Sequence, residues 1–191
     1  MRAVGEVKAP FPLSVGGEVE LELLDETHAE ELFALVDANR AYLRRWLPWL
    51  DQNTEVEHTR AFLRATQKQH ADRNGFTCGI RWRGGLVGVV GLHGIDWVNR
   101  KTSIGYWVAE AHQGKGLVTR ACAALLAHLF DDLGLNRVEI GCAPGNARSA
   151  AVPERLGFTR EGLLRQPERL YDRYVDHLVY GLLASEWRQG R

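Results

Sequence analysis

The chain has 191 residues, a length typical of one compact domain, and it contains 24 basic and 24 acidic side chains. With 45% hydrophobic and 25% charged residues, it has the composition of a globular protein rather than of a disordered or low-complexity chain. Because the charges balance, the composition provides no basic field for nucleic acid, and we predict neither nucleic-acid nor membrane binding.

Cysteine and histidine spacing argues against a metal site. The three cysteines are an odd number without C-x-x-C spacing, so neither a disulfide scaffold nor a cysteine-based zinc site is expected. The seven histidines lack the spacing of metal ligands, and we expect no metal. Residues Met1–Pro12 lack the apolar core of a signal peptide, and Ala121–Phe130 is too short to cross a bilayer. We therefore expect a cytoplasmic protein in a reducing compartment.

The first part of the chain predicts a strand followed by two helices. In Val19–Leu23, apolar and acidic residues alternate with the period of a half-buried strand. Two capping boxes then indicate helix starts, one at Thr27 with Glu30 and one at Thr54 with Glu57.

A meander of strands is predicted next. Phe76–Trp82 and Leu86–Ile95 form a hairpin around a turn at Gly84-Gly85, and Thr102–Ala109 is a further strand rich in β-branched and aromatic residues. No internal repeat or linker divides the chain, so we predict a single domain over residues 1–191 with its core at about residues 18–187.

The last part alternates helices and strands. A helix begins near Gly116 and ends at Gly134, and the strand Arg137–Cys142 follows it. The short helix Ala147–Leu156 and the late strand Tyr174–Leu183 complete the pattern. Helices, a meander and then β-α-β-α-β predict a mixed α+β (or α/β) domain around one sheet.

The segment His112–Thr119 lies between a predicted strand and a helix and contains two closely spaced glycines. Glycines let backbone N–H groups approach a ligand, and a helix start adds free donors and a positive dipole end, which suits a pyrophosphate. A P-loop is excluded, because Gly114-Lys115 is followed by Gly116 where a P-loop has the Ser or Thr that holds Mg²⁺. A dinucleotide-binding fingerprint is also excluded, because the third glycine of that motif is missing after Gly114 and Gly116. On spacing alone, a plain glycine turn at a helix start fits equally well.

The residues Gln113-x-x-Gly116-x-Val118 resemble the acetyl-CoA signature (R/Q-x-x-G-x-G/A) of the GNAT N-acetyltransferase superfamily, with valine in place of the final small residue. Four further segments resemble the subfamily that acetylates ribosomal-protein N-termini: Tyr42–Leu50, Ile104–Val108, Asn146–Phe158 and Tyr180–Leu183. This resemblance implies the GNAT fold, with one central, mostly antiparallel sheet flanked by helices. It also implies that acetyl-CoA is the cosubstrate and binds in the cleft between the fold's fourth and fifth strands. The acetyl group would be transferred directly to an amine. A homodimer is possible.

The resemblance also assigns coenzyme contacts by position. They fall on Val108, Gln113, Gly114, Lys115, Gly116, Val118, Thr119, Asn146 and Ser149. For Val108 the expected contact is its backbone N–H, which any residue type would supply.

Acetyl transfer to an amine requires a polarised carbonyl, removal of a proton from the amine, and a proton for the departing thiolate. Many family members place the acid, a tyrosine, seven residues after Asn146, where this chain has Pro153. The resemblance to the ribosomal-protein subfamily assigns the acid to Ser149 and the base to Glu168. The alternatives are a Ser149 that caps its own helix and a Glu168 that only solvates a loop.

The acceptor is predicted less directly. Trp46 and Trp49 could wall an acceptor pocket or belong to the core. The stretch Arg40–Asp51 has three arginines and one aspartate, which favours a neutral or acidic acceptor such as a protein N-terminus. The alternatives are a small-molecule acetyltransferase for an aminoglycoside or polyamine, and a coenzyme-binding module without catalysis.

Overall fold

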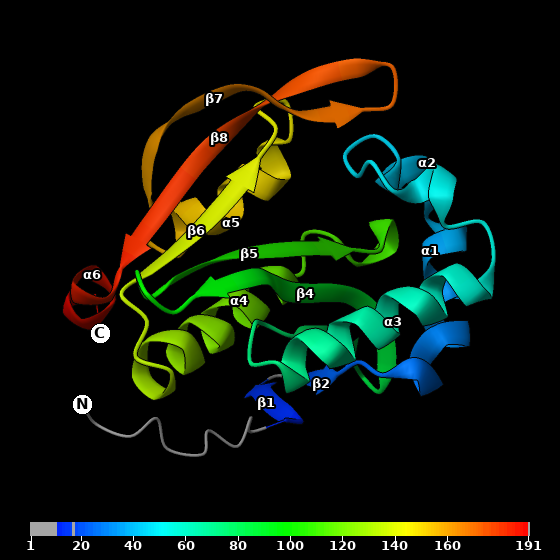
Figure 1. The fold of residues 1–191 in the computed structure, drawn as a ribbon, viewed down its shortest axis with the longest axis horizontal. Coiled ribbons are helices and arrows are strands. Elements are labelled where there is room, and N and C mark those ends of the chain that lie inside the picture. The colour runs from blue at the N-terminus through cyan, green and yellow to red at the C-terminus, as the bar shows by residue number, and fades with distance from the viewer. Residues whose placement is uncertain (1–10, 17, 191) are drawn as a thin grey trace.

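The computed structural model describes residues 11–16 and 18–190 (Figure 1). Its helices and strands follow in the order β1 (Leu13–Gly16), β2 (Val19–Leu23), α1 (Ala29–Ala38), α2 (Arg40–Leu43), α3 (Val56–Ala71), β3 (Thr77–Trp82), β4 (Gly85–Asp96), β5 (Lys101–Val108), α4 (Leu117–Ala127), β6 (Arg137–Cys142), α5 (Ala147–Arg155), β7 (Thr159–Leu170), β8 (Arg173–Leu183) and α6 (Ala184–Gln189). Most of the segment Met1–Pro12, on which the signal-peptide prediction rests, lies outside the described residues. No helix in the described ranges is long and apolar enough to span a membrane.

The strands form one eight-stranded sheet in the order β1-β2-β3-β4-β5-β6-β8-β7. Neighbouring strands are antiparallel except for β5 and β6, which are parallel because the chain crosses over through α4 between them. The prediction of a single, mostly antiparallel sheet flanked by helices is confirmed.

Helices cover both faces of the sheet. On one face, here called the α4–α5 face, the two helices pack on residues such as Ile104 of β5, Ile140 of β6 and Tyr180 of β8. On the other, the α1–α3 face, α1 and α3 pack on Val89 of β4 and Trp107 of β5. Since successive residues of a strand point to opposite faces, these contacts fix the side of the sheet on which each neighbouring residue lies.

Strands β5 and β6 pair only along their first residues. Their parallel register ends with Ser103 opposite Glu139, although β5 continues to Val108 and β6 to Cys142. Beyond that point β5 stays paired with β4 and β6 with β8, so the two halves of the sheet separate (Figure 1). The separation leaves backbone groups along the facing edges of β5 and β6 without a strand partner.

Glycine accounts for two boundaries that the sequence predicts. The helix expected from Gly116 to Gly134 consists of α4 and a π-helical turn, and Gly134 follows with φ +65°, the left-handed conformation suited to a helix end. The β3–β4 turn lies one residue earlier than expected, on Arg83 and Gly84, with φ of +54° and +81°. Two left-handed central residues are typical of a tight type I′ hairpin.

Neither predicted capping box forms. A 3-10 turn precedes α1, and its cap is Asp25, whose carboxylate accepts a hydrogen bond from the Thr27 N–H while the His28 ring accepts one from the Asp25 N–H. Helix α3 starts after Glu55, and no side chain caps it. The first of the two predictions was wrong because the Asp25 carboxylate accepts the Thr27 N–H in the 3-10 turn before α1 begins.

The sequence did not reveal β1 and β7. Strand β7 lies at the edge of the sheet and most of its side chains are exposed, including Leu163 and Leu164, so it lacks the alternation that marks a half-buried strand. Its register with β8 shifts between Leu164 and Glu168. Glu168 therefore lies half-buried on a strand instead of in a solvated loop.

Candidate active site

The turn before α4, residues 113–116, is here called the anion turn because its backbone geometry suits an anion. Gly114 and Gly116 have φ of +71° and +70°, a conformation that favours glycine, and Gly116 is the N-cap of α4. A β-carbon on either glycine would meet no atom within 4 Å, so the space above the turn is open. The first amides of a helix have no intrahelical acceptor, and the positive end of the helix dipole adds to their attraction for a phosphate.

Gln113 supplies a further donor beside this turn. Its Nε2 is buried and has no hydrogen-bond partner among the described residues, while its Oε1 accepts a hydrogen bond from Arg148 of α5. Buried donors rarely stay unpaired in a protein, so an unpaired amide here points to a ligand oxygen. The half-buried Val118 and Thr119 complete the first turn of α4. The ammonium of Lys115 lies 4.4 Å from the centre of the Trp82 ring.

Val108 presents its backbone to the separation of β5 and β6. The Ala109 N–H donates to the Val87 carbonyl of β4 at 2.8 Å, and Val108 lies opposite Gly88. In an antiparallel ladder, the flanking residues then bond to the partner strand while Val108 points its own N–H and C=O away from it. Those groups face the edge that β6 has left, which is the geometry required of a donor to a thioester carbonyl or a pantetheine amide.

Ser149 lies in the first turn of α5, beside the same separation. Asn146 is the N-cap of α5 and accepts a hydrogen bond from the Ser149 N–H at 3.3 Å, so the helix is capped by Asn146 and not by Ser149. The Ser149 hydroxyl instead donates to the Tyr106 hydroxyl at 3.4 Å, which in turn donates to the Ser149 carbonyl at 2.9 Å. Burial raises the pKa of Tyr106 far above its usual range, so the phenol keeps its proton.

Cys142 lies next to Ser149 at the end of β6. Burial raises the pKa of its thiol, and so does the nearby carboxylate of Glu154, while a hydrogen bond with Ser149 acts in the opposite direction. A neutral buried thiol is a poor nucleophile, and Cys142 belongs to the hydrophobic cluster on this face.

The segment after α2 reaches across the sheet from the α1–α3 face. The ring of Trp46 lies 3.7 Å from where a β-carbon of Gly145 would stand, in the loop that follows β6. The Leu47 carbonyl accepts a hydrogen bond from the Tyr171 hydroxyl, at the β7–β8 turn, at 2.7 Å. Trp49 instead packs against the cluster of α1 and α3, as expected of a core residue. Of the two predicted tryptophans, the structure brings Trp46 to the site.

Glu168 of β7 contacts a histidine that the sequence did not single out. The Glu168 Oε2 lies 3.1 Å from Nε2 of His177 on β8, and both side chains are half-buried. Gly141 of β6 lies beside the same ring, since its β-carbon would be 3.6 Å from the His177 Nδ1. Ile140 and Cys142 point to the α4–α5 face, so Gly141 and the histidine lie on the α1–α3 face.

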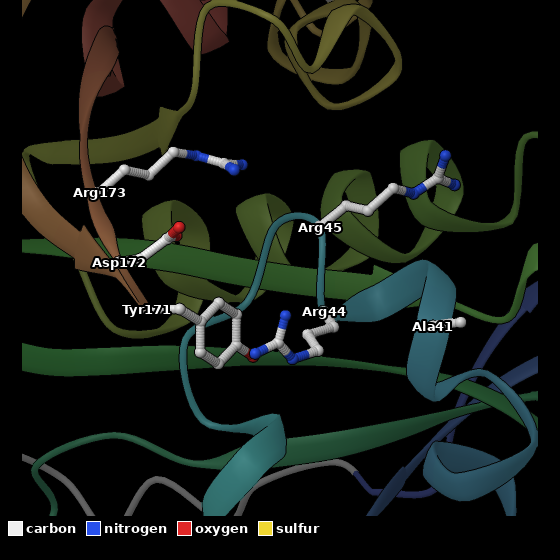
Figure 2. Close-up of a pocket in the computed structure, with 6 residues that line it drawn as sticks. All are labelled: Ala41, Arg44, Arg45, Tyr171, Asp172 and Arg173. Carbon is white, nitrogen blue, oxygen red and sulfur yellow. The ribbon is translucent and has the colours of Figure 1, made fainter.

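A pocket of about 170 Å³ opens between α2 and the β7–β8 turn. Figure 2 shows its lining: Ala41, Arg44, Arg45, Tyr171, Asp172 and Arg173. Arg44 forms two hydrogen bonds of 2.7 Å with Asp51 and stacks over the Tyr171 ring at 3.8 Å. Arg45 reaches a carboxylate oxygen of Glu110 only at 3.7 Å, and Arg173 has no ion pair within the described part of the chain.

These residues meet at the separation of β5 and β6 from opposite faces of the sheet. The anion turn, Ser149 and Tyr106 lie on the α4–α5 face, whereas Glu168 and His177 lie on the α1–α3 face together with Trp46. The described residues hold no group of three His, Cys, Asp or Glu side chains suited to a metal ion. Tyr106, Arg148 and His177 were not predicted from the sequence. A signal existed for Tyr106, because its hydroxyl lies within the apolar second half of β5 and needs a hydrogen-bond partner when buried.

The chain is similar to known acetyltransferases over most of its length. A family model described as an acetyltransferase (GNAT) domain matches residues 18–159. YdaF of Bacillus subtilis (strain 168) is 38% identical over 178 residues, which cover 93% of this chain and 97% of YdaF. The ribosomal-protein-serine acetyltransferase of Escherichia coli (strain K12) is 32% identical over 173 residues, 91% of this chain and 97% of that protein. The solved structure of a ribosomal L7/L12 alpha-N-protein acetyltransferase in complex with coenzyme A has a TM-score of 0.87 at 31% identity and covers 91% and 98% of the two chains.

Proposed function

Because this chain belongs to the GNAT acetyltransferase family, we propose that it acetylates the N-terminal amine of a protein, with a ribosomal protein as first candidate. That it is an acetyl-CoA-dependent N-acetyltransferase follows from the family and its relatives. Transfer is direct, within a ternary complex, because burial raises the pKa of all three cysteine thiols and leaves none activated as a nucleophile. The unpaired cysteines also agree with a cytoplasmic location.

One observation carries this proposal: the candidate acid and the candidate base face the gap between β5 and β6 from opposite sides of the sheet. Ser149 lies on the α4–α5 face, beside the anion turn, and Glu168 lies on the α1–α3 face. A coenzyme and an amine that approach from opposite faces would meet there without competing for space. Such an arrangement suits a reaction in which both substrates are bound at once.

The residues present fit acetyl-CoA, which supplies the acetyl thioester. The open turn at Gly114 and Gly116 and the unpaired Gln113 amide would hold the pyrophosphate, with Lys115, Val118 and Thr119 beside them. Val118 is accommodated in the first turn of α4, where it packs against the core. The backbone N–H of Val108 would polarise the thioester carbonyl, and Asn146 would keep the start of α5 in place.

The remaining chemistry consists of two proton movements. On the α1–α3 face, Glu168 contributes to removal of a proton from the acceptor amine, because its half-buried carboxylate contacts the His177 ring beside the gap. On the α4–α5 face, the Ser149 hydroxyl gives a proton to the departing sulfur, and its partner Tyr106 orients it.

The pocket between α2 and the β7–β8 turn favours an acceptor with an acidic side chain. Three arginines and one aspartate line it, and Arg45 and Arg173 are the least neutralised of the arginines. A polycationic aminoglycoside or polyamine would be repelled there, whereas the N-terminus of an acidic polypeptide would be attracted. The names of two relatives, a ribosomal-protein-serine acetyltransferase and a ribosomal L7/L12 acetyltransferase, support a protein acceptor.

The test is to incubate the chain and acetyl-CoA with peptides whose first residues are neutral, acidic or basic, and with spermidine and an aminoglycoside. Mass spectrometry locates the acetyl group, and release of the free coenzyme A thiol gives the rate. We expect acetylation at the peptide α-amine. Faster acetylation of the small amines would reject the protein acceptor, and binding of acetyl-CoA without product would indicate a binding module.

A further inference from the structure

We propose that His177 is the general base that takes the proton from the acceptor amine, and that Glu168 is a positioning residue that holds its ring. This proposal rests on the proposed function and adds a residue that neither the family resemblance nor the histidine spacing indicated. It follows from the contact between the two side chains and from what surrounds the free ring nitrogen.

The contact defines which ring nitrogen carries the proton. Nε2 of His177 lies 3.1 Å from the Glu168 Oε2. A carboxylate can only accept hydrogen bonds, and a neutral imidazole has one N–H and one lone pair. The N–H is therefore on Nε2, and the lone pair is on Nδ1. A base oriented by a carboxylate on its far nitrogen is a recurring arrangement in catalytic sites.

The free nitrogen lies beside β6, a strand that borders the gap in the sheet. Nδ1 is the ring atom beside Gly141, whose missing side chain leaves room next to it. Gly141 lies two residues after Glu139, the last β6 residue that pairs with β5, so Nδ1 lies beside the part of β6 that has separated from β5. No described residue donates a hydrogen bond to Nδ1 or accepts one from it. An amine that enters from the α1–α3 face could therefore reach it.

The geometry is less favourable for Glu168 as a direct base. Its Oε2 is already engaged by the imidazole, and the register shift between Leu164 and Glu168 brings the carboxylate against β8. A general base works best when its proton affinity matches the operating pH, and imidazole meets that condition at neutral pH better than a carboxylate does.

The proton balance closes without any further reactant. An acceptor ammonium gives up two protons in all. His177 takes one at Nδ1 and passes it to solvent after turnover. Ser149 gives its hydroxyl proton to the sulfur as the nitrogen–carbon bond forms and the carbon–sulfur bond breaks. The second proton leaves the amide nitrogen and returns to Ser149 through solvent.

The experiment compares three variants on whichever amine the wild-type chain acetylates fastest, so that a wrong acceptor and a wrong base give separate results. His177→Gln keeps an N–H donor for Glu168 but removes the basic nitrogen. His177→Ala leaves space for added imidazole, and Glu168→Gln removes the carboxylate. The control is His58→Gln, which breaks an exposed histidine–glutamate contact of 3.4 Å on α3. Thermal unfolding and acetyl-CoA binding confirm that each variant is folded.

We expect His177→Gln to lower kcat by roughly 10²–10³-fold at saturating acceptor, with the KM for acetyl-CoA unchanged. Imidazole should restore part of the rate of His177→Ala and none of the rate of His177→Gln, in which glutamine fills the space. Glu168→Gln should lose less than His177→Gln. The control should keep wild-type kcat. Near wild-type kcat in His177→Gln, or a His177→Ala variant that imidazole does not restore, would overturn the proposal.

Discussion

Gly116→Asp tests the anion turn with a built-in comparison. Gly116 has φ +70° and a β-carbon there would meet no atom within 4 Å, so aspartate introduces backbone strain and a charge but no clash. Gly134, after the π-helical turn that follows α4, has φ +65° and is equally open. Gly134→Asp therefore carries the same strain and the same charge at the opposite end of this helical segment.

The two substitutions should have similar effects on stability. A non-glycine residue in the left-handed region costs about 1 kcal/mol, and aspartate tolerates it better than most residues. The helix dipole favours aspartate at the start of α4 and disfavours it at the end, by about 0.3–1 kcal/mol in each case. Gly116→Asp should therefore be no less stable than Gly134→Asp in urea unfolding.

Their effects on acetyl-CoA affinity should differ. A carboxylate about 5 Å from a phosphate charge is repelled by about 1–3 kcal/mol for effective dielectric constants between 80 and 20. Because 1.4 kcal/mol corresponds to a factor of ten, calorimetry should show a loss of acetyl-CoA affinity between about fivefold and about 150-fold for Gly116→Asp. Gly134→Asp should bind like the wild type. Equal affinities in the two folded variants would remove the turn from the coenzyme site.

Ser149, Arg173 and Arg81 can each be tested by a single substitution. Ser149→Ala should lower turnover by about 10²-fold while acetyl-CoA affinity persists, and wild-type thiol release would leave this hydroxyl without a role in proton transfer. Arg173→Ala should raise the KM for acidic peptides several-fold and leave the KM for neutral peptides unchanged. The control variant is Arg188→Ala on α6. An equal rise in KM for acidic and neutral peptides would show that the pocket does not select acidic acceptors. The hydrogen bonds from Arg81 lower the pKa of Glu31 below its ordinary 4.5, so unfolding free energy should fall as pH drops below about 4.5. Arg81→Gln should reduce that dependence in urea titrations, whereas an unchanged slope would refute the assignment.

The fold was predictable wherever one face of an element is buried. Val19–Leu23 alternates because one side packs on α4, and the bounds of the strand match those of β2. The glycines at both ends of the helical segment set its limits because only a residue that tolerates positive φ can stand there. Strand β7 was not predicted because its side chains are mostly exposed on both faces, and no periodicity distinguishes such a strand from a loop.

From residue types and spacing alone, the candidate site could be predicted only where its residues lie near one another in the sequence. The turn from Gln113 to Gly116 is continuous, so its motif could be found in the chain itself. Glu168 and His177 are separated by nine residues and meet only across the β7–β8 hairpin, with a register shift in between. Because β7 was not predicted, the register of that hairpin could not be predicted either, and no partner of His177 could be identified from the sequence.

The separation of β5 and β6 explains why so few side chains are needed for this chemistry. If β5 and β6 paired along their whole length, the Val108 N–H would be hydrogen-bonded to β6. The parallel pairing instead ends five residues earlier, at Ser103. An unpaired backbone donor costs stability unless a ligand or water satisfies it, so the interrupted sheet favours occupation by an acceptor group such as a thioester carbonyl. The same interruption opens both faces at one point, where the proposed acid on α5 and the proposed base on β8 would act on a single bond rearrangement. In this proposal the sheet itself is part of the site, because further pairing of β5 with β6 would remove both the Val108 donor and the opening between the faces.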